Sequence, residues 1–453
     1  GLSAATVQRM PQYVLEPLPL MAMCRTRRGS RKSRSDSTEI HVTRDPSSSS
    51  ITGGSEPHQS IPRGLLRRRA FFVAVVAAAS ACALGGLALS TVGASASRRV
   101  LAPHRGAGSQ PSSSSPQHLV VLQHGLSGTV GDLSRLAREL QDKSGGEVLV
   151  HSAGYNAGRN LDGVSAGGRR LAQEIVDVVN RHSSLSRISL VGNSLGGLYT
   201  RYALAELFEK TVGLGSRGRI AGLAPEAFVT IGCPHLGVRR FTFVAVPQLL
   251  RSAAGVLFGR TGEDLMLRDR ACLLERMAAE DGGFLESLRA FNRRGVYANL
   301  WGDFMVPFGT AAFEPSWGSG LLDEQSVSTL LRRPGIEVVD REVLERKSDG
   351  IALRWDVDAS ASDAASVWAM DDDDREAAQE ADMAANLERC GWSKFAVGFR
   401  STGTFFPMAH NKLAAVERSG WRKWAFSWLE GTTDGDCLMG EIAAYILDSP
   451  EDS

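Results

Sequence analysis

The sequence predicts an α/β fold in which helices flank a mostly parallel sheet. Two observations predict it. Short apolar runs that end in glycine or a small polar residue alternate along the chain with segments of helical periodicity. The composition, 43% hydrophobic and 22% charged, is typical of a globular chain and excludes a wholly disordered, collagen-like or polytopic membrane protein. A net charge of +1 gives no indication of nucleic-acid binding.

The first predicted elements alternate between strand and helix. The run "HLVVLQHG" (118–125) is typical of a buried parallel strand, and "EVLV" (147–150) is the next strand. Apolar residues within 168–180 recur at intervals of three and four, which predicts a helix. A strand "RISLVGNS" (187–194), a helix "LGGLYTRYALAELFEK" (195–210) and a strand "EAFVTIG" (226–232) follow.

The later elements repeat this pattern less regularly. An apolar run "GVYANLWGDFMVP" (295–307) and a strand-like "WSKFAVGF" (392–399) precede a helix-like "AHNKLAAV" (409–416). The tail from Trp421 through "CLMGEIAAYILD" suggests a final helix that covers the sheet. We therefore expect one domain over 118–450, with a cap at about 238–290 and an acidic insertion at about 340–388.

The front of the chain differs in charge from the rest. Residues 1–99 hold 14 basic and 5 acidic side chains, a net +9, while residues 100–453 hold 37 and 45, a net −8. We expect a basic, Ser/Arg-rich disordered or targeting segment at 1–69 and a linker at 98–117.

Between those segments, residues 70–97 form an uncharged apolar run that is preceded by three arginines. Its length predicts a single-pass membrane anchor near residues 70–92, with the N-terminus on the cytosolic side. The alternative is a cleaved secretory or plastid-type signal, because Ala94-Ser95-Ala96 fits a cleavage site.

Neither a metal nor a cofactor is expected. The six cysteines show no CxxC spacing, so most are predicted to be buried thiols. The run Asp371–Asp374 lacks the glycine and the spaced ligands of a calcium loop.

The motif Gly192-Asn193-Ser194-Leu195-Gly196 lies where a predicted strand meets a predicted helix. This context favours a nucleophile elbow over a plain strand–helix turn. The turn is sharp enough that side chains at 192 and 196 would collide with neighbouring segments. Ser194 would stand at the positive N-terminus of the helix as an acyl-transfer nucleophile.

An oxyanion hole needs two backbone donors. The N–H of Leu195, directly after the nucleophile, is one candidate, and the N–H of Leu126, in the loop after the first strand, is the other. We expect His124 to shape that loop rather than to transfer protons.

After such an elbow the acid and then the histidine follow in sequence. Of the two histidines after Ser194, His235 follows with no aspartate between, so the order predicts His410 as the base. Asp303 ends an apolar run, where the chain leaves the sheet, and is the preferred acid. The alternatives for the acid are Asp323, Asp340 and Asp349.

Six blocks together carry a family resemblance: "HLVVLQHGLSG", "LVGNSLGGLYTRYA", "TIGCPHLGVRR", "FGRTGEDLMLRD", "FNRRGVYAN" and "AHNKLAAV". They resemble a serine esterase/lipase family of the α/β-hydrolase superfamily with plant and algal members. The resemblance covers roughly 118–310 and 390–418 and implies a triad of Ser194, Asp303 and His410. One departure is Cys233, where the family usually has threonine.

The expected function is that of a carboxylic-ester hydrolase which cleaves lipid esters through a Ser–His–Asp acyl-enzyme. A lipid acyltransferase with the same triad, or a non-catalytic scaffold or lipid-binding protein, is the alternative. The apolar segment at 238–290 fits a lid over the acyl pocket as well as it fits ordinary core. The expected partners are a lipid or small acyl-ester substrate and a membrane surface, with no nucleic acid and the oligomeric state left open.

Overall fold

The computed structural model describes residues 115–210, 218–241, 258–303, 305–317, 324–359, 375–400, 409–416 and 435–448. The chain divides into two units, one of Gly1–Ala22 with Ser109–Ser453 and one of Met23–Gly108. Every described residue belongs to the first unit. The predicted targeting segment, the apolar run and most of the predicted linker lie outside the described residues.

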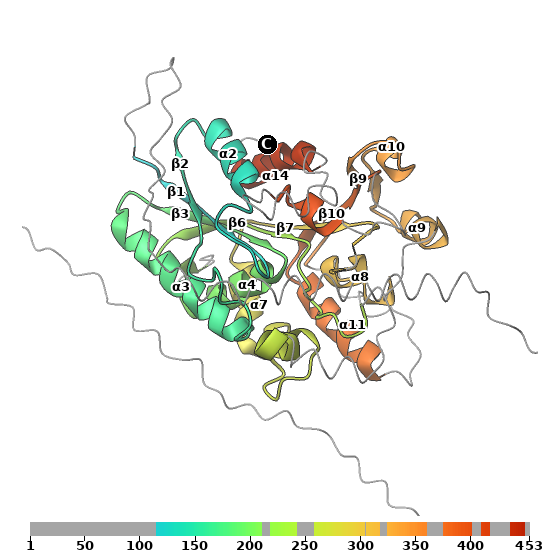
Figure 1. The fold of residues 1–453 in the computed structure, drawn as a ribbon, viewed down its shortest axis with the longest axis horizontal. Helices are drawn as coiled ribbons and strands as arrows, with labels where there is room; N and C mark the ends of the chain where they lie inside the picture. The colour runs from blue at the N-terminus through green and yellow to red at the C-terminus, as the bar shows by residue number, and fades with distance from the viewer. Residues whose placement is uncertain are drawn as a thin grey trace, which may run out of the picture. The chain divides into compact units, whose positions relative to one another are not determined.

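An eight-stranded sheet forms the centre of the domain (Figure 1). Six neighbouring strands are parallel, and the last two are antiparallel to their neighbours. In spatial order the strands are β2 (Val148–Ser152), β1 (His118–Gln123), β3 (Arg187–Asn193), β6 (Ala224–Ile231), β7 (Arg293–Asn299), β10 (Trp392–Gly398), β9 (Gly350–Val357) and β8 (Glu337–Val338). A separate two-stranded pair joins β4 (Phe208–Glu209) and β5 (Arg219–Ile220).

Two apolar layers cover the sheet, one on each face. Successive side chains of β1 alternate between them, because side chains on a strand point to opposite faces. Leu119 and Val121 belong to one buried cluster, and Val120 and Leu122 belong to the other. All six residues of β1 are buried, which explains why this strand is a continuous apolar run.

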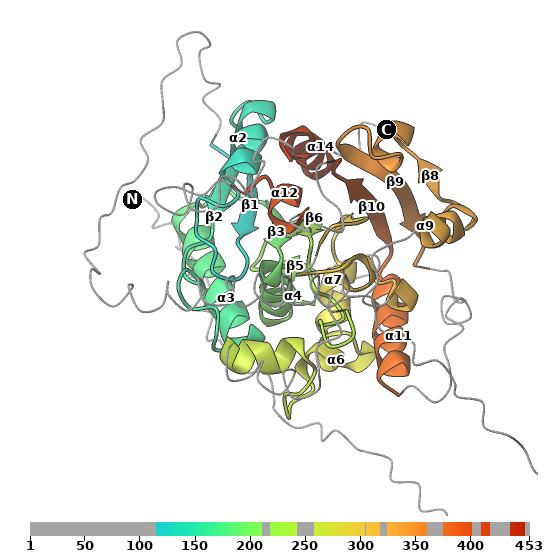
Figure 2. The same ribbon diagram turned by 45° about the vertical axis from the view of Figure 1, so that its right-hand side comes forward.

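The helices divide between these layers (Figure 2). One layer holds α2 (Ser134–Lys143), α12 (Ala409–Leu413) and α14 (Asp436–Leu447). The other holds α3 (Val164–Arg181), α4 (Leu195–Leu207), α6 (Leu273–Met277), α7 (Phe284–Arg289) and α11 (Arg375–Glu388). The shorter helices are η1 (Glu280–Gly282), α8 (Phe308–Ala311), η2 (Pro315–Trp317), α9 (Glu324–Leu331) and α10 (Arg341–Leu344).

The predicted fold class, α/β with a mostly parallel sheet flanked by helices, is therefore confirmed. The predicted strands from 118 to 232 and the helices at 168–180 and 195–210 occur within a few residues of their expected bounds. The final helix is present as α14. The antiparallel strands β8 and β9 and the helix α2 were not predicted.

Part of the predicted acidic insertion belongs to the main fold. Residues 350–357 form β9 and residues 375–388 form α11, while residues 360–374 lie outside the described residues. Glu388 is buried on α11 because Lys394 of β10 donates to its Oε1 at 2.5 Å. Lys394 also lies 3.4 Å from Glu314 Oε1, so a buried cation pairs with acids from two segments.

The described part of the predicted cap is largely core. Residues 242–257 lie outside the described residues. Apolar side chains of α6 and α7, including Leu274, Met277 and Leu288, are buried in the cluster that also contains α3 and α4. The described helices of this segment therefore stabilise the domain.

Helical residues 258–265 attach this segment to the start of α3. The backbone N–H of Val164, the first residue of α3, donates to Asp264 Oδ2 at 2.7 Å. The N–H of Gly163 donates to Thr261 Oγ1 at 3.0 Å, so two free amides at the helix N-terminus are satisfied by side chains about 100 positions later. Burial raises the pKa of Asp264 to about 7.

The prediction of a single-pass membrane anchor is contradicted. In the part of the chain that the structure describes, no helix has both the length and the apolar character that a bilayer span requires. The longest fully described helix, α3, has 18 residues and carries charged side chains such as Arg170 and Glu174. Residues 70–92, on which the prediction was based, lie outside the described residues.

Candidate active site

Ser194 lies at the junction between β3 and α4. Its backbone has φ 55° and ψ −129°, a conformation that non-glycine residues rarely adopt. The N–H of Ser194 donates to the carbonyl of Ile231 on β6 at 2.8 Å, and its own carbonyl accepts from the N–H of Gly197 at 2.9 Å. The strained turn is thus held by hydrogen bonds on both sides, as expected for a nucleophile elbow.

Two glycines of the motif are required by close backbone contacts. A Cβ atom added to Gly192 would lie 2.4 Å from the Cα atom of Gly197. A Cβ atom added to Gly196 would lie 2.4 Å from the carbonyl oxygen of Gln123 and 2.6 Å from that of His124. Side chains at 192 and 196 would therefore collide with neighbouring backbone, as the sequence predicts. Asn193 between them is buried.

Three side chains from distant segments form a hydrogen-bonded chain. Ser194 Oγ lies 2.9 Å from His410 Nε2, and His410 Nδ1 lies 2.8 Å from Asp303 Oδ2. The serine hydroxyl can donate to Nε2 while the Nδ1–H donates to the carboxylate. All three side chains are buried. The structure therefore brings together the three residues that the sequence analysis selected.

The Asp303 carboxylate is fixed by further donors. The backbone N–H groups of Met305 and Val306 donate to Oδ1 at 3.0 and 2.8 Å. The side-chain Nδ2 of Asn299 donates to Oδ2 at 2.7 Å. Asn299 was missed by the sequence analysis, although its position at the end of β7, shortly before the aspartate, marks it as a polar residue at the site.

The loop after β1 passes directly beside the nucleophile. A Cβ atom added to Gly125 would lie 2.7 Å from the Cβ atom and 3.3 Å from the Oγ atom of Ser194. Leu126 follows in this loop and is half-buried, while Leu195 is the buried first residue of α4. The two predicted oxyanion donors thus belong to the two backbone segments that flank Ser194.

Buried polar side chains form hydrogen bonds that hold this loop in place. Gln123 Nε2 donates to the carbonyl of His124 at 2.9 Å, and Gln123 Oε1 accepts from Asn156 Nδ2 at 3.1 Å. The Nδ1 atom of His124 lies 3.0 Å from the carbonyl of Gly125. The predicted role of His124 in shaping the loop fits this contact.

His235 is not a member of this hydrogen-bonded chain. It is fully buried, with Nε2 3.0 Å from Thr230 Oγ1 and Nδ1 3.3 Å from a guanidinium nitrogen of Arg201. Burial, together with the charge of Arg201, places the pKa of His235 well below its usual value. This histidine is therefore a neutral core residue.

The alternative acids serve other purposes or lie outside the described residues. Asp340 accepts from the N–H of Glu342 and caps α10, and Asp349 Oδ1 accepts from the N–H of Arg400. Asp323 lies outside the described residues. Within the described ranges, no group of three or more His, Cys, Asp or Glu side chains could hold a metal ion. The run Asp371–Asp374 is not among them.

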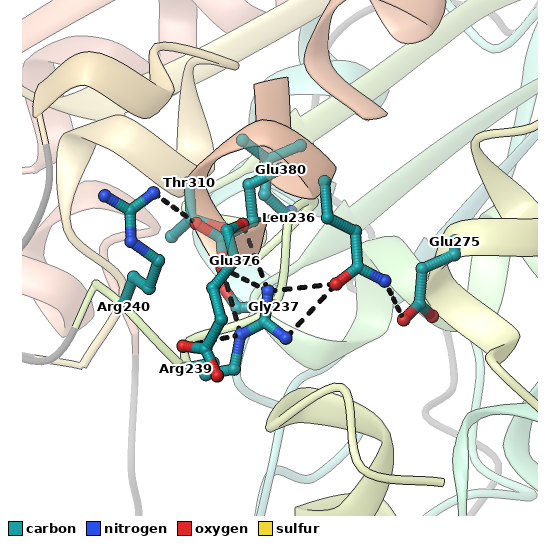
Figure 3. A network of polar contacts seen from close by, with 9 residues as sticks. Leu236, Gly237, Arg239, Arg240, Glu275, Thr310, Glu376 and Glu380 are labelled. Carbon is teal, nitrogen blue, oxygen red and sulfur yellow. Dashed lines mark hydrogen bonds and ion pairs between the residues drawn. The ribbon is translucent and has the colours of Figure 1, made fainter. Parts of the chain in front are cut away.

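A polar network holds the loop that follows β6 (Figure 3). Arg239 and Arg240 each donate to Glu380 of α11, the first to Oε1 and the second to Oε2, both at 3.1 Å. The Glu380 side chain is fully buried and accepts from both guanidinium groups. A charged residue of the acidic segment thus pairs with cations about 140 positions earlier.

The same loop is attached to α8 on its other side. Thr310 Oγ1 accepts from the N–H of Leu236 at 3.1 Å and donates to the carbonyl of Gly237 at 2.7 Å (Figure 3). Because α8 follows shortly after Asp303 in the chain, this contact connects the loop after β6 with the segment that carries the acid.

The parallel sheet, the elbow after β3 and the order serine, aspartate, histidine define an α/β-hydrolase. Residues 113–316 match the family model described as "Putative serine esterase (DUF676)". The resemblance that the sequence predicts is therefore confirmed over this segment, which is somewhat less than half of the chain. The predicted enzyme class, a carboxylic-ester hydrolase, agrees with the description of this family model as a serine esterase.

Two curated fungal relatives match the same part of the chain. "Putative lipase C4A8.10" of Schizosaccharomyces pombe is 32% identical over 214 residues, which cover 44% of this chain and 26% of the relative. "Putative lipase ROG1" of Saccharomyces cerevisiae is 31% identical over 203 residues, covering 43% and 28%. The match thus spans about a quarter of the length of these relatives.

Among solved structures, the mature form of Bacillus licheniformis lipase BlEst2 is 16% identical, with a TM-score of 0.28. The match covers 49% of this chain and 76% of the lipase.

Proposed function

We propose that this chain hydrolyses carboxylic esters of lipids through an acyl-enzyme formed on Ser194. The observation that carries the proposal is the hydrogen-bonded chain from Ser194 through His410 to Asp303. A serine hydroxyl is a weak nucleophile unless a base within hydrogen-bonding distance takes its proton, and His410 Nε2 is at that distance. A lipid ester as the substrate is supported by the relatives, whose names describe them as lipases.

In the first half of the reaction, Ser194 Oγ attacks the ester carbonyl carbon while His410 Nε2 takes the hydroxyl proton. The Asp303 carboxylate stabilises the imidazolium through Nδ1–H. The N–H groups of Leu126 and Leu195 are the proposed donors to the oxyanion. When the C–O bond to the alcohol breaks, His410 returns its proton to the leaving alcohol, and the acyl group stays on Oγ.

In the second half, water replaces the alcohol. His410 takes a proton from the attacking water, and a second tetrahedral intermediate forms at the same carbonyl. Its collapse releases the carboxylic acid and returns the proton to Ser194 Oγ. The enzyme is then regenerated without a change in oxidation state.

The test is covalent labelling with a fluorophosphonate probe, in parallel with release of fatty acid from monoacylglycerol, lysophospholipid and galactolipid in detergent micelles. We expect wild type to be labelled and active, and S194A to be neither. S144A is the matched control, because the half-buried Ser144 follows α2 and its hydroxyl donates to the carbonyl of Gln141 in its own turn. Absence of labelling in wild type would overturn the proposal.

A second arm separates hydrolysis from acyl transfer. An added long-chain alcohol competes with water for the acyl-enzyme. Fatty acid as the main product supports the hydrolase. A new ester as the main product, at unchanged labelling, would show an acyltransferase with the same triad.

A further inference from the structure

Asn299 occupies a position that the reaction itself does not explain. It ends β7, its side chain is only 1% exposed, and its Nδ2 donates to Asp303 Oδ2 at 2.7 Å. The same oxygen accepts from His410 Nδ1 at 2.8 Å. The Asn299 amide and the His410 ring therefore bind the same oxygen of Asp303.

The other end of the amide makes no comparable contact. Within the described residues, Asn299 Oδ1 is buried and has no hydrogen-bond partner. Burial of a polar atom without a partner costs free energy, so an apolar side chain of similar size would stabilise the strand end better. The amide orientation is fixed by chemistry, since the oxygen would repel a carboxylate that the NH₂ group can bind.

The remaining contacts of Asp303 leave one motion open. The N–H groups of Met305 and Val306 both bind Oδ1. These two donors fix the position of Oδ1, but they do not prevent a rotation of the carboxylate that moves Oδ2. A donor on Oδ2 that comes from the rigid end of a strand removes this freedom.

We infer that Asn299 is a positioning residue, which holds Oδ2 of Asp303 in line with the Nδ1–H of His410. It acts through Asp303 and does not contact the reacting atoms. This inference depends on the proposed function only where activity is the readout. Its structural part concerns the Asp303–His410 pair and can be tested without turnover.

The described hydrogen bonds of Asp303 and His410 stay within the site. Asp303 contacts His410, Asn299 and the two backbone amides, and His410 contacts Asp303 and Ser194. Among the described residues, the adjoining segments carry the ionisable side chains of His124, in the loop after β1, and Lys412, on α12. Neither is altered by a substitution at 299.

The test compares wild type with N299L and N299D. In the first readout, the resonance of the His410 Nδ1–H is followed by proton NMR, with its assignment made by loss in H410A. We expect a sharp low-field resonance in wild type and a broadened or lost one in N299L, because a carboxylate whose Oδ2 moves away no longer holds this proton in a hydrogen bond. An unchanged Nδ1–H resonance in folded N299L would overturn the inference.

The second readout is the pH profile of kcat/KM on a soluble ester. We expect N299L to lose about 10- to 100-fold in kcat at nearly unchanged KM, as for a hydrogen bond to a charged group. In N299D the introduced carboxyl is buried beside Asp303, which keeps it protonated at low pH and able to donate. N299D should therefore approach wild type at low pH and lose activity as pH rises.

The outcomes separate the inference from the proposed function. A loss in N299D that is the same at every pH would indicate a packing role and would overturn the positioning role. If wild type is neither labelled nor active, the proposed function fails, while the His410 Nδ1–H resonance still decides the role of Asn299. Thermal denaturation of N299L and N299D checks that both variants are folded before either readout is compared with wild type.

Discussion

The Nε2 atom of His410 lies 2.9 Å from Ser194 Oγ, although 216 positions separate the two residues. Ser194 follows β3, and Asp303 follows β7, two places further across the sheet. The carboxyl ends of parallel strands lie at one edge of the sheet, so these turns approach each other there. His410 completes the arrangement from α12, which packs on β7 and lies in the helical layer with α14.

Asp303→Asn should abolish most of the activity. The amide would present either a donor or an acceptor to His410 Nδ1 and would no longer stabilise the imidazolium. We expect a loss of about 10⁴-fold in kcat, measured on a soluble ester. Asp340→Asn is the control, because Asp340 only caps α10 and should leave kcat unchanged. Equal losses in both variants would contradict the assignment of the acid.

Gly196→Ala should remove activity through the backbone. The added methyl group would lie 2.4 Å from the carbonyl oxygen of Gln123, so the elbow or the loop after β1 must shift. Either shift moves Ser194 relative to the proposed oxyanion donors, the N–H groups of Leu126 and Leu195. We therefore expect at least about a 100-fold loss in the rate of fluorophosphonate labelling.

Gly440→Ala is the matched control for this change. Gly440 lies within α14, where the nearest atom to an added Cβ is 3.7 Å away. Alanine should stabilise the helix there by up to about 1 kcal/mol and leave labelling unchanged. Full labelling of G196A would show that the elbow tolerates a side chain and that the glycine is not required.

Glu380→Gln should destabilise the domain. The substitution removes the charge between Arg239 and Arg240 and leaves two largely buried guanidinium groups under-compensated. We expect the free energy of unfolding to fall by about 3 kcal/mol, measured by urea denaturation. Glu376→Gln, on the same helix but half-exposed, should cost less than about 1 kcal/mol. Similar costs for the two variants would argue against the buried network.

Asp264→Asn should remove a pH dependence of stability. Burial raises the pKa of Asp264 from 3.8 to about 7, so between those values the folded state holds a proton that the unfolded state releases. Wild-type stability should therefore fall as pH rises from about 4 to 7 through this group. The variant keeps the oxygen that caps α3 and cannot ionise, so it should be the more stable form at pH 8.

The gain should amount to a few kcal/mol at most, since one pKa unit corresponds to about 1.4 kcal/mol. Asp162→Asn is a control of opposite sign, because the hydrogen bond from Arg170 lowers the pKa of Asp162. This variant should lose stability at neutral pH relative to wild type. A D264N protein that is less stable than wild type at pH 8 would show that the ionised carboxylate is favourable.

Local patterns were sufficient to predict much of this fold and to select the three residues of the proposed triad. The strands β1 and β3 are buried on both faces and therefore form continuous apolar runs. The elbow is also local, because the contacts that exclude side chains at 192 and 196 arise within the turn and the adjacent loop. Asp303 and His410 followed from chain order and from the ends of predicted elements.

The acidic segment shows where local patterns fail. The sequence predicts an acidic insertion here, yet Glu380 and Glu388 are buried within the main fold. Their partners are Arg239, Arg240 and Lys394, and the first two lie about 140 positions earlier in the chain. Charge composition cannot show such pairing, because the neutralising cations belong to other elements. Asn299 escaped notice for a similar reason, since its role depends on which oxygen of Asp303 it meets.

The outer edge of the sheet has a consequence for self-association. Among the described residues, the two-residue strand β8 pairs with Leu353 and Arg354 of the eight-residue β9, and the N–H groups of Val339 and Asp340 donate to the carbonyl of Ala352. The rest of this edge of β9 has no described partner strand. Unpaired peptide groups on an edge strand are a template for a strand from another molecule. Here the exposed side chains of Arg354 and Asp356 place charges of both signs on β9, which disfavours such growth. Replacing both residues by valine should promote self-association through this edge and raise light scattering as the protein is concentrated. Unchanged scattering would mean that these two charges are not what prevents association.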